Sequence, residues 1–165
     1  MPPAPIPPRI LIVEDSIFLT LALQDMCDSL GWALVGPAVT LADGLRLARA
    51  EPIDAALLDV EIGDSQSWDI AELLQQRGIP FAFTTGHSLD RVLPARFSRA
   101  PILRKPFRLA GVEQMINTLL PSAASPSPAR TDRDVQMLDR VIAARASLEA
   151  APASPQPAAP AKPIA

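Results

Sequence analysis

An apolar run at residues 55–58 ends abruptly at the carboxylate of Asp59. A continuous apolar run bounded by polar residues is typical of a strand buried on both faces of a parallel sheet. Ligands of such sheets bind at the carboxyl ends of the strands, so Asp59 is expected at the rim of a crevice. This stretch therefore predicts a parallel sheet with a reactive carboxylate at one edge.

Four more apolar runs have the same form, and segments of helical periodicity separate them. The predicted strands are residues 9–13, 33–35, 53–59, 79–86 and 101–104. The predicted helices are residues 17–30, 41–50, 88–93 and 109–120, and a helix that begins at Ser65 or Ser67 and ends at Arg77. This alternation predicts an α/β fold, a doubly wound five-stranded parallel sheet of the flavodoxin-like type.

Capping and turn residues set the bounds of these elements. Ser16 and Thr40 are candidate N-caps of the first two helices, and Gly31 is a candidate helix stop. The second strand is expected to end at Gly36 and Pro37. Residues 63–65 and 94–100 are expected to form loops.

Proline content separates the folded domain from its flanks. Of the 19 prolines, five precede Arg9 and eight lie from Pro121 onward. The predicted organisation is a proline-rich leader (1–8), a folded domain (9–121), a linker (122–130), an amphipathic helix (131–150) and a disordered Pro/Ala tail (151–165).

The segment 131–150 has apolar residues at helical spacing with charges between them. They are Val135, Leu138, Val141, Ile142 and Leu148, which we call the apolar stripe. This pattern predicts a helix that either folds back onto the domain or binds a partner or a second copy, and the sequence leaves both open.

Composition limits the class of protein. The net charge of −3 argues against a broad nucleic-acid interface, which is usually basic. Apolar stretches stay shorter than the roughly 18 residues of a membrane span, and residues 1–8 lack the features of a signal peptide. The single Cys27 excludes an internal disulfide and a cysteine-built metal site. We expect a cytoplasmic protein that binds neither nucleic acid nor membranes.

Polar side chains follow four of the predicted strands. Glu14 and Asp15 follow the first strand, Asp59 the third, Thr85 the fourth and Lys105 the fifth. Each has a simpler interpretation alone, such as a helix cap or a surface lysine. Because parallel strands share their carboxyl edge, however, the set is expected to converge.

Three converging carboxylates repel one another, and a hard cation such as Mg²⁺ relieves the repulsion. A metal-neutralised Asp59 is a competent nucleophile toward a phosphoryl group. Lys105 can neutralise the transferred phosphoryl oxygens, and Thr85 can donate a hydrogen bond to them. The pattern therefore predicts phosphorylation of Asp59.

The chain resembles the response-regulator receiver domain over residues 9–120. The matching segments are Val13-Glu14-Asp15, Leu57-Leu58-Asp59, Thr85-Gly86 and Lys105-Pro106-Phe107. The resemblance implies a CheY-like fold and phosphorylation of Asp59 by a partner sensor histidine kinase. It also implies that Mg²⁺ is bound by Asp15, Asp59 and the backbone carbonyl of Glu61, with Glu14 helping through water.

The same resemblance assigns three further roles. Thr85 is the switch hydroxyl, Lys105 is the phosphate-binding lysine, and the bond between Lys105 and Pro106 is expected to be cis, which would aim the lysine into the crevice. Many receivers carry an aromatic switch residue three positions before the lysine, where this chain has Ile102. The proline common in the loop after the phosphorylated Asp is also missing.

Residues 80–87 resemble a receiver subgroup named for a Phe-Ala-Thr-Gly-hydrophobic-Tyr motif. Thr84 replaces its Ala, and His87 with Ser88 departs from its ending. The subgroup consists largely of stand-alone regulators of bacterial stress signalling. His87 is a candidate modulator of acyl-phosphate hydrolysis or a kinase contact, and a solvated loop histidine is an equally good interpretation. Glu61 is a second candidate modulator, at the site entrance.

These features predict a stand-alone response regulator that signals by phosphorylation-dependent binding of an unidentified protein. The face of the fourth helix, the fifth strand and the last helix is the expected output surface. We expect no turnover enzyme, and a dimer through the last helix or the helix 131–150 stays open. The alternatives are a phosphorylation-independent binding module and an aspartate-nucleophile phosphatase, whose Asp-x-Asp motif would here end in Glu61.

Overall fold

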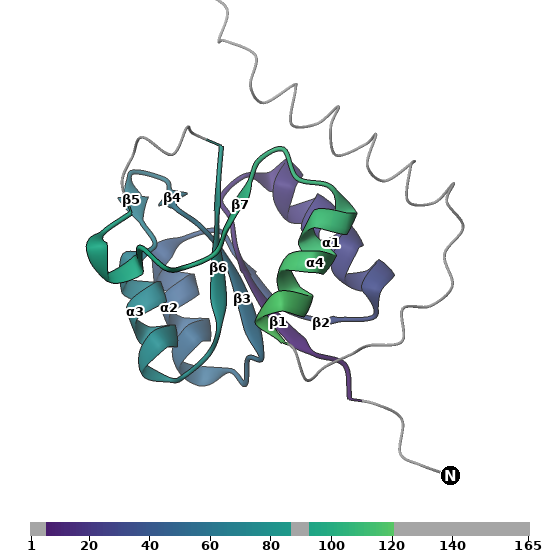
Figure 1. The fold of residues 1–165 in the computed structure, drawn as a ribbon, viewed down its shortest axis with the longest axis horizontal. Coiled ribbons are helices and arrows are strands. Elements are labelled where there is room, and N and C mark those ends of the chain that lie inside the picture. The colour runs from purple at the N-terminus through teal and green to yellow at the C-terminus, as the bar shows by residue number, and fades with distance from the viewer. Residues whose placement is uncertain (1–5, 87–92, 121–165) are drawn as a thin grey trace, which may run out of the picture.

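The computed structural model describes residues 6–86 and 93–120. Five parallel strands form one sheet in the order β2-β1-β3-β6-β7: β1 (Arg9–Val13), β2 (Ala33–Ala38), β3 (Ala55–Asp59), β6 (Phe81–Thr85) and β7 (Ile102–Arg104). Four α-helices are described: α1 (Ile17–Leu30), α2 (Leu41–Ala50), α3 (Trp68–Gln76) and α4 (Leu109–Leu119). Helices α1 and α4 cover one face of the sheet, and α2 and α3 cover the other (Figure 1). The predicted doubly wound five-stranded parallel sheet is confirmed.

Alternating residues of each central strand enter two separate apolar layers. In β1, Ile10 and Ile12 pack with α1 and α4, whereas Leu11 and Val13 pack with α2 and α3. All four side chains are at most 1% exposed. A strand buried on both faces must be apolar throughout, which is the pattern that its sequence shows.

Local side-chain chemistry fixes the first two helices. Ser16 Oγ accepts a hydrogen bond from the Leu19 amide at 3.3 Å, and Thr40 Oγ1 accepts one from the Asp43 amide at 3.1 Å. Such N-caps stabilise a helix by about 1 kcal/mol each. Gly31 ends α1 with a φ of 68°, a left-handed conformation that glycine adopts without steric cost. The predicted caps and the predicted bounds of α1 and α2 are confirmed.

The expectation that the second strand ends at Gly36 and Pro37 is wrong. Strand β2 continues to Ala38, and the Gly36–Pro37 peptide bond is cis. Gly36 has a φ of 98°, and a Cβ atom there would lie 2.8 Å from the Ala38 nitrogen and 3.1 Å from the Ile12 oxygen. Glycine is therefore required for β2 to run this close to β1, and here it continues a strand.

Two predicted loops contain secondary structure. Residues around Gly63 form a short antiparallel hairpin, β4 (Glu61–Ile62) and β5 (Ser65–Gln66), which we call the rim hairpin. Its Ile62 is only 4% exposed, so an apolar contact anchors it to the domain. The interval before β7 contains a 3-10 helix, η1 (Ala95–Phe97), and Phe97 is buried.

Several predictions lie outside the described residues. These are most of the leader, all but the last residue of the helix 88–93, and the linker, helix and tail after residue 121.

Ser67 precedes α3 at the N-cap position, but its side chain makes no capping hydrogen bond. Among residues 6–86 and 93–120, no helix has the length and apolar character needed to cross a bilayer.

Candidate phosphoacceptor site

The carboxyl edge of the sheet brings together three of the predicted site residues. Glu14 follows β1, Asp59 ends β3 and Lys105 follows β7. Lys105 Nζ lies 2.6 Å from Asp59 Oδ2 and 2.7 Å from Glu14 Oε2. One ammonium group therefore lies between two carboxylates that come from different strands.

Burial controls the electrostatics of this group. Glu14 is 1% exposed and Asp59 is 7% exposed. Burial and, to a smaller extent, the neighbouring Asp59 charge raise the pKa of Glu14 to about 7, although Lys105 opposes both effects. Burial also raises the pKa of Asp59, although the attraction of Lys105 works against it.

The two carboxylates raise the pKa of Lys105, whereas burial lowers it. Burial lowers the pKa of Lys105, but the charges of Glu14 and Asp59 outweigh this, so its pKa lies above the ordinary value. Lys105 therefore stays charged at neutral pH. The site thus holds a permanent cation beside two acids that take up protons more readily than usual.

The third acid, Asp15, completes a group that could hold a metal ion. One ligand atom each from Glu14, Asp15 and Asp59 lies within 4.8 Å of the others. Three carboxylate oxygens at this spacing suit a hard cation such as Mg²⁺, which takes oxygen ligands and keeps several waters. The predicted acidic ligands therefore fit the predicted cofactor.

The rim hairpin contacts two of these acids through backbone amides. The Gly63 amide donates a hydrogen bond to Asp15 Oδ2 at 2.8 Å, and the Glu61 amide donates one to Asp59 Oδ1 at 3.4 Å. Glu61 therefore lies next to the phosphoacceptor candidate, as its position two residues later predicts. The contact with Gly63 was not predicted, because the loop was expected to lack regular structure.

The switch residues lie at the ends of β6 and β7, the two strands on one side of β3 and Asp59. Thr85 is half-buried at the end of β6, and its carbonyl accepts a hydrogen bond from the Lys105 amide at 2.8 Å. Its neighbour Thr84 is buried and pairs in register with Asp59. The Lys105–Pro106 bond is cis, as the resemblance implies. His87 lies outside the described residues.

Ile102 stands where many receivers have an aromatic switch residue, and it lies on the face of the sheet that α2 and α3 cover. Ile102 is half-buried, pairs in register with Phe83 and packs in the apolar layer beneath α2 and α3. The sequence reasoning missed what fills this layer, a group of four rings that we call the aromatic cluster. It consists of Trp68, Phe81, Phe83 and Phe97, with neighbouring ring centroids 5.4 to 6.1 Å apart.

One signal for the aromatic cluster was present in the sequence. Phe81 and Phe83 are two residues apart in a strand, so their side chains lie on the same face of the sheet. Phe97 had no such signal, because its segment has no clear period. The cluster joins β6, the strand next to β3 and Asp59, to α3 and η1.

Comparison with known structures agrees with this geometry. The solution structure of SdrG from Sphingomonas melonis Fr1 is 41% identical, with a TM-score of 0.62, and the match covers 69% of this chain and 97% of that chain. The PhyR response regulator receiver domain from Erythrobacter litoralis is 27% identical, with a TM-score of 0.59, and the match covers 74% of this chain and 97% of that chain. The chain belongs to the response-regulator receiver family. No family model matches the sequence.

Two further matches extend the comparison. The BeF3-activated conformation of SdrG from Pseudomonas melonis Fr1 is 40% identical, with a TM-score of 0.60, over 68% of this receiver and 95% of that chain. The phyllosphere-induced regulator PhyR of Methylorubrum extorquens is 26% identical over 115 residues, or 68% of this receiver. This receiver spans only 43% of that regulator's length. The shared part supports a response-regulator role.

Proposed function

We propose that this receiver is a stand-alone switch of a two-component phosphorelay, phosphorylated on Asp59 by a sensor histidine kinase. The observation that carries the proposal is the buried Asp59 carboxylate, 2.6 Å from the Lys105 ammonium and beside two further acids. The match to nearly the full SdrG chain supports the stand-alone role. A cytoplasmic location follows from the proposed kinase partner.

The proposed reaction is transfer of a phosphoryl group to a carboxylate oxygen of Asp59. That oxygen attacks phosphorus, an acyl phosphate forms, and the bond from phosphorus to the donor's imidazole nitrogen breaks. Asp15, Asp59 and the Glu61 carbonyl would hold Mg²⁺, with Glu14 assisting through water, and the bound ion would supply positive charge next to the phosphoryl oxygens. Lys105 already contacts one carboxylate oxygen of Asp59, so it can neutralise the charge that arrives.

The switch would act through groups that meet the new charge. Thr85 ends β6, the strand beside β3 and Asp59, and its hydroxyl would donate a hydrogen bond to a phosphoryl oxygen. Its carbonyl already holds the Lys105 amide, so movement of Thr85 is transmitted directly to the lysine segment. We propose that the resulting change at β7 and α4 alters binding of a protein partner.

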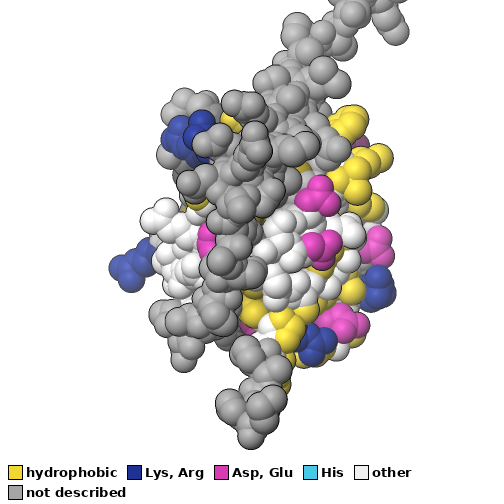
Figure 2. Space-filling view, turned by 90° about the vertical axis from the view of Figure 1, so that its right-hand side faces the viewer, with side chains coloured by type: hydrophobic (Ala, Val, Ile, Leu, Met, Phe, Trp, Pro, Cys, Tyr) yellow, Lys and Arg dark blue, Asp and Glu magenta, His cyan; other side chains and the backbone are white. Residues whose placement is uncertain are grey.

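An exposed apolar patch on α1 is the proposed binding surface for the kinase. Ile17, Phe18 and Leu21 are 70%, 44% and 46% exposed, and Val39 after β2 is 45% exposed. Helix α1 begins two residues after Asp15, so the patch lies beside the site. Figure 2 shows exposed apolar side chains on the side of the molecule that carries α1 and α4. Patches of this kind on a soluble domain mark interaction surfaces.

Phosphorylation with a small donor tests the proposal. Incubation with acetyl phosphate and Mg²⁺ should add one phosphoryl group per chain, measured by intact mass spectrometry under conditions that preserve acyl phosphates. Asp59→Asn should abolish the gain, whereas Asp64→Asn, which removes an exposed acid of the rim hairpin, should retain it. Equal labelling of Asp59→Asn and the native chain would refute the assignment.

The same assay separates the alternatives. A binding module that does not use phosphorylation would take up no phosphoryl group and would show no beryllofluoride-induced amide shifts at the site. An aspartate-nucleophile phosphatase would turn over a phosphomonoester many times per chain. We propose that the protein is not a turnover enzyme, so the expected product is a single acyl phosphate that hydrolyses slowly.

A further inference from the structure

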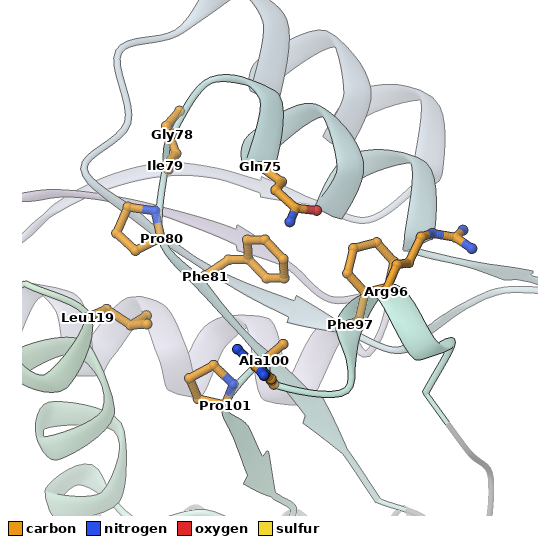
Figure 3. A pocket seen from close by; sticks show the side chains of 11 residues that line it. Gln75, Gly78, Ile79, Pro80, Phe81, Arg96, Phe97, Ala100, Pro101 and Leu119 are labelled. Carbon is orange, nitrogen blue, oxygen red and sulfur yellow. The ribbon is translucent and has the colours of Figure 1, made fainter.

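A pocket of about 410 Å³ lies at the amino edge of the sheet, opposite the phosphoacceptor site. Its walls come from the segment that enters β6, from η1, from the segment that enters β7 and from the end of α4. The central lining residues are Phe81, Phe97, Ala100, Pro101 and Leu119 (Figure 3). We call it the amino-edge pocket.

This pocket is separate from the proposed phosphorylation chemistry. Phe81 begins β6 and Thr85 ends it, so the two regions are about 13 Å apart along the strand. The Phe81 and Phe97 rings lie 6.1 Å apart and form an apolar wall. Arg96 does not place an unpaired charge there, because its guanidinium contacts Glu72 at 2.6 Å and lies over the Phe97 ring. The pocket therefore suits an apolar side chain.

The course of the chain indicates which side chain is available. Leu119 lines the pocket, and α4 ends at this residue, so the described part of the chain ends next to the pocket. Figure 3 shows Leu119 at one end of the pocket and Phe97 at the other. The ten residues 121–130 contain three prolines and span about 30 Å when extended. The apolar stripe can therefore return to the pocket.

Charge supports the same occupant. Arg99 is exposed and lines the pocket. Residues 131–150 contain three Asp, one Glu and three Arg, a net charge of −1 (3 − 4), and the three Asp all lie in the first half of the segment. Because the segment is tethered next to the pocket, its effective concentration there is in the millimolar range, and weak contacts suffice for docking. We propose that residues 131–150 dock in the amino-edge pocket through the apolar stripe, with Leu138 as the central side chain.

Docking of this segment would have two consequences. It would cover the apolar ends of β6 and β7, and a partner protein would have to displace it to reach them. Docking would not require phosphorylation, so the docking proposal can be tested independently of the role of Asp59.

Paramagnetic labelling of the full chain tests the proposal. Helical spacing places Ala143 opposite the apolar stripe, so a nitroxide attached to Ala143→Cys should not disturb docking. The native Cys27 is 1% exposed, which protects it from the reagent. We expect the amide peaks of Ile79, Phe81 and Ala100 to lose about half or more of their intensity, because the tethered segment is mostly docked.

The matched control is Leu138→Asp in the same labelled chain, which should restore these intensities. Amide peaks in α1, around Phe18 and Leu21, should be unaffected in both chains. Selective broadening around Phe18 and Leu21 would overturn the proposal in favour of docking on the α1 patch. Broadening that is absent, or that Leu138→Asp leaves unchanged, would overturn it as well. Repeating the experiment with Asp59→Asn should give the same result, which separates it from the proposed phosphorylation.

Discussion

The two edges of the sheet use the same strands for opposite purposes. At the carboxyl edge, the Lys105 ammonium lies within 2.7 Å of carboxylate oxygens of both Glu14 and Asp59, and burial raises the pKa of both acids. At the amino edge, the strand that ends at Thr85 begins with Phe81, in the wall of an apolar pocket. One parallel sheet thus separates a charged reaction site from a site suited to apolar binding.

The two edges of the sheet are expected to differ in what they contribute: the amino edge to stability and the carboxyl edge to phosphoryl transfer. A buried ion pair contributes little net stability, because desolvation of the charges offsets most of their attraction. Packed aromatic rings have no such penalty, and each contributes through its buried area and ring contacts. We therefore expect changes at the amino edge to affect the free energy of unfolding and changes at the carboxyl edge to affect phosphoryl transfer.

The largest effect is expected from Phe97→Ala. Phe97 is 2% exposed and contacts three other rings of the aromatic cluster, so its removal should lower the free energy of unfolding by about 3 kcal/mol. Urea denaturation measures this loss, and Phe97→Leu should lose less because it fills more of the cavity. The fraction phosphorylated by acetyl phosphate should stay unchanged under conditions where the variant is folded. A loss of labelling in the folded variant would mean that the edges are not independent.

Lys105→Met is expected to slow phosphorylation rather than to lower the free energy of unfolding. The variant removes the cation next to Asp59, so phosphorylation by acetyl phosphate should slow about 100-fold, the typical effect of deleting one charge-stabilising donor. The initial rate of labelling checks this. Lys105→Arg keeps the charge but not the compact shape of an ammonium group, so it should recover only part of the rate. A native rate in Lys105→Met would show that the lysine only balances the charge of the acids.

The next effect concerns pH and Mg²⁺. Protons compete with the cation for the acidic site, and the pKa of Glu14 is about 7. Mg²⁺ affinity should therefore rise between pH 6 and pH 7, by up to about tenfold per pH unit for one displaced proton, and level off above pH 7. Isothermal titration calorimetry at several pH values measures this. In Glu14→Gln the rise should be smaller, and an identical slope would remove Glu14 as its source.

The smallest effect is expected from Glu72→Gln, which removes the ion-pair partner of Arg96, a lining residue of the amino-edge pocket. The ion pair between Glu72 and Arg96 is about half-exposed, with side-chain exposures of 42% and 50%. Exposed pairs contribute below about 1 kcal/mol, so the midpoint of urea unfolding should hardly move. A loss comparable with that of Phe97→Ala would show that charge, rather than ring packing, holds η1 in place.

The sequence predicted the sheet, the four α-helices that the structure describes and the convergence of Glu14 and Asp59 on Lys105. These features depend on short-range patterns, namely apolar runs, N-caps such as Ser16 and polar residues at strand ends. The continuation of β2 through Gly36 was not predictable in this way, because the contact that requires glycine comes from Ile12 on a neighbouring strand. The rim hairpin depends likewise on burial of Ile62 and on the hydrogen bond from Gly63 to Asp15.

The amino-edge pocket could not be predicted from the sequence either, because it too depends on contacts between distant segments. Its walls come from four segments that are distant in sequence, and Phe97 lies in a stretch without a regular period. A pocket is a gap between elements, so no single segment carries its pattern. The roles assigned to Thr85 and Glu61 stay predictions, although both residues lie beside the site.

The two tryptophans divide the molecule in a useful way. Trp32 is buried in the layer beneath α1 and α4, whereas Trp68 packs on Phe83 and Phe97 in the other layer. With no tyrosine in the chain, these two residues dominate its near-ultraviolet emission. Each layer of the domain therefore carries its own intrinsic fluorophore, and replacing either tryptophan with phenylalanine leaves a chain whose emission reports on one side of the sheet alone.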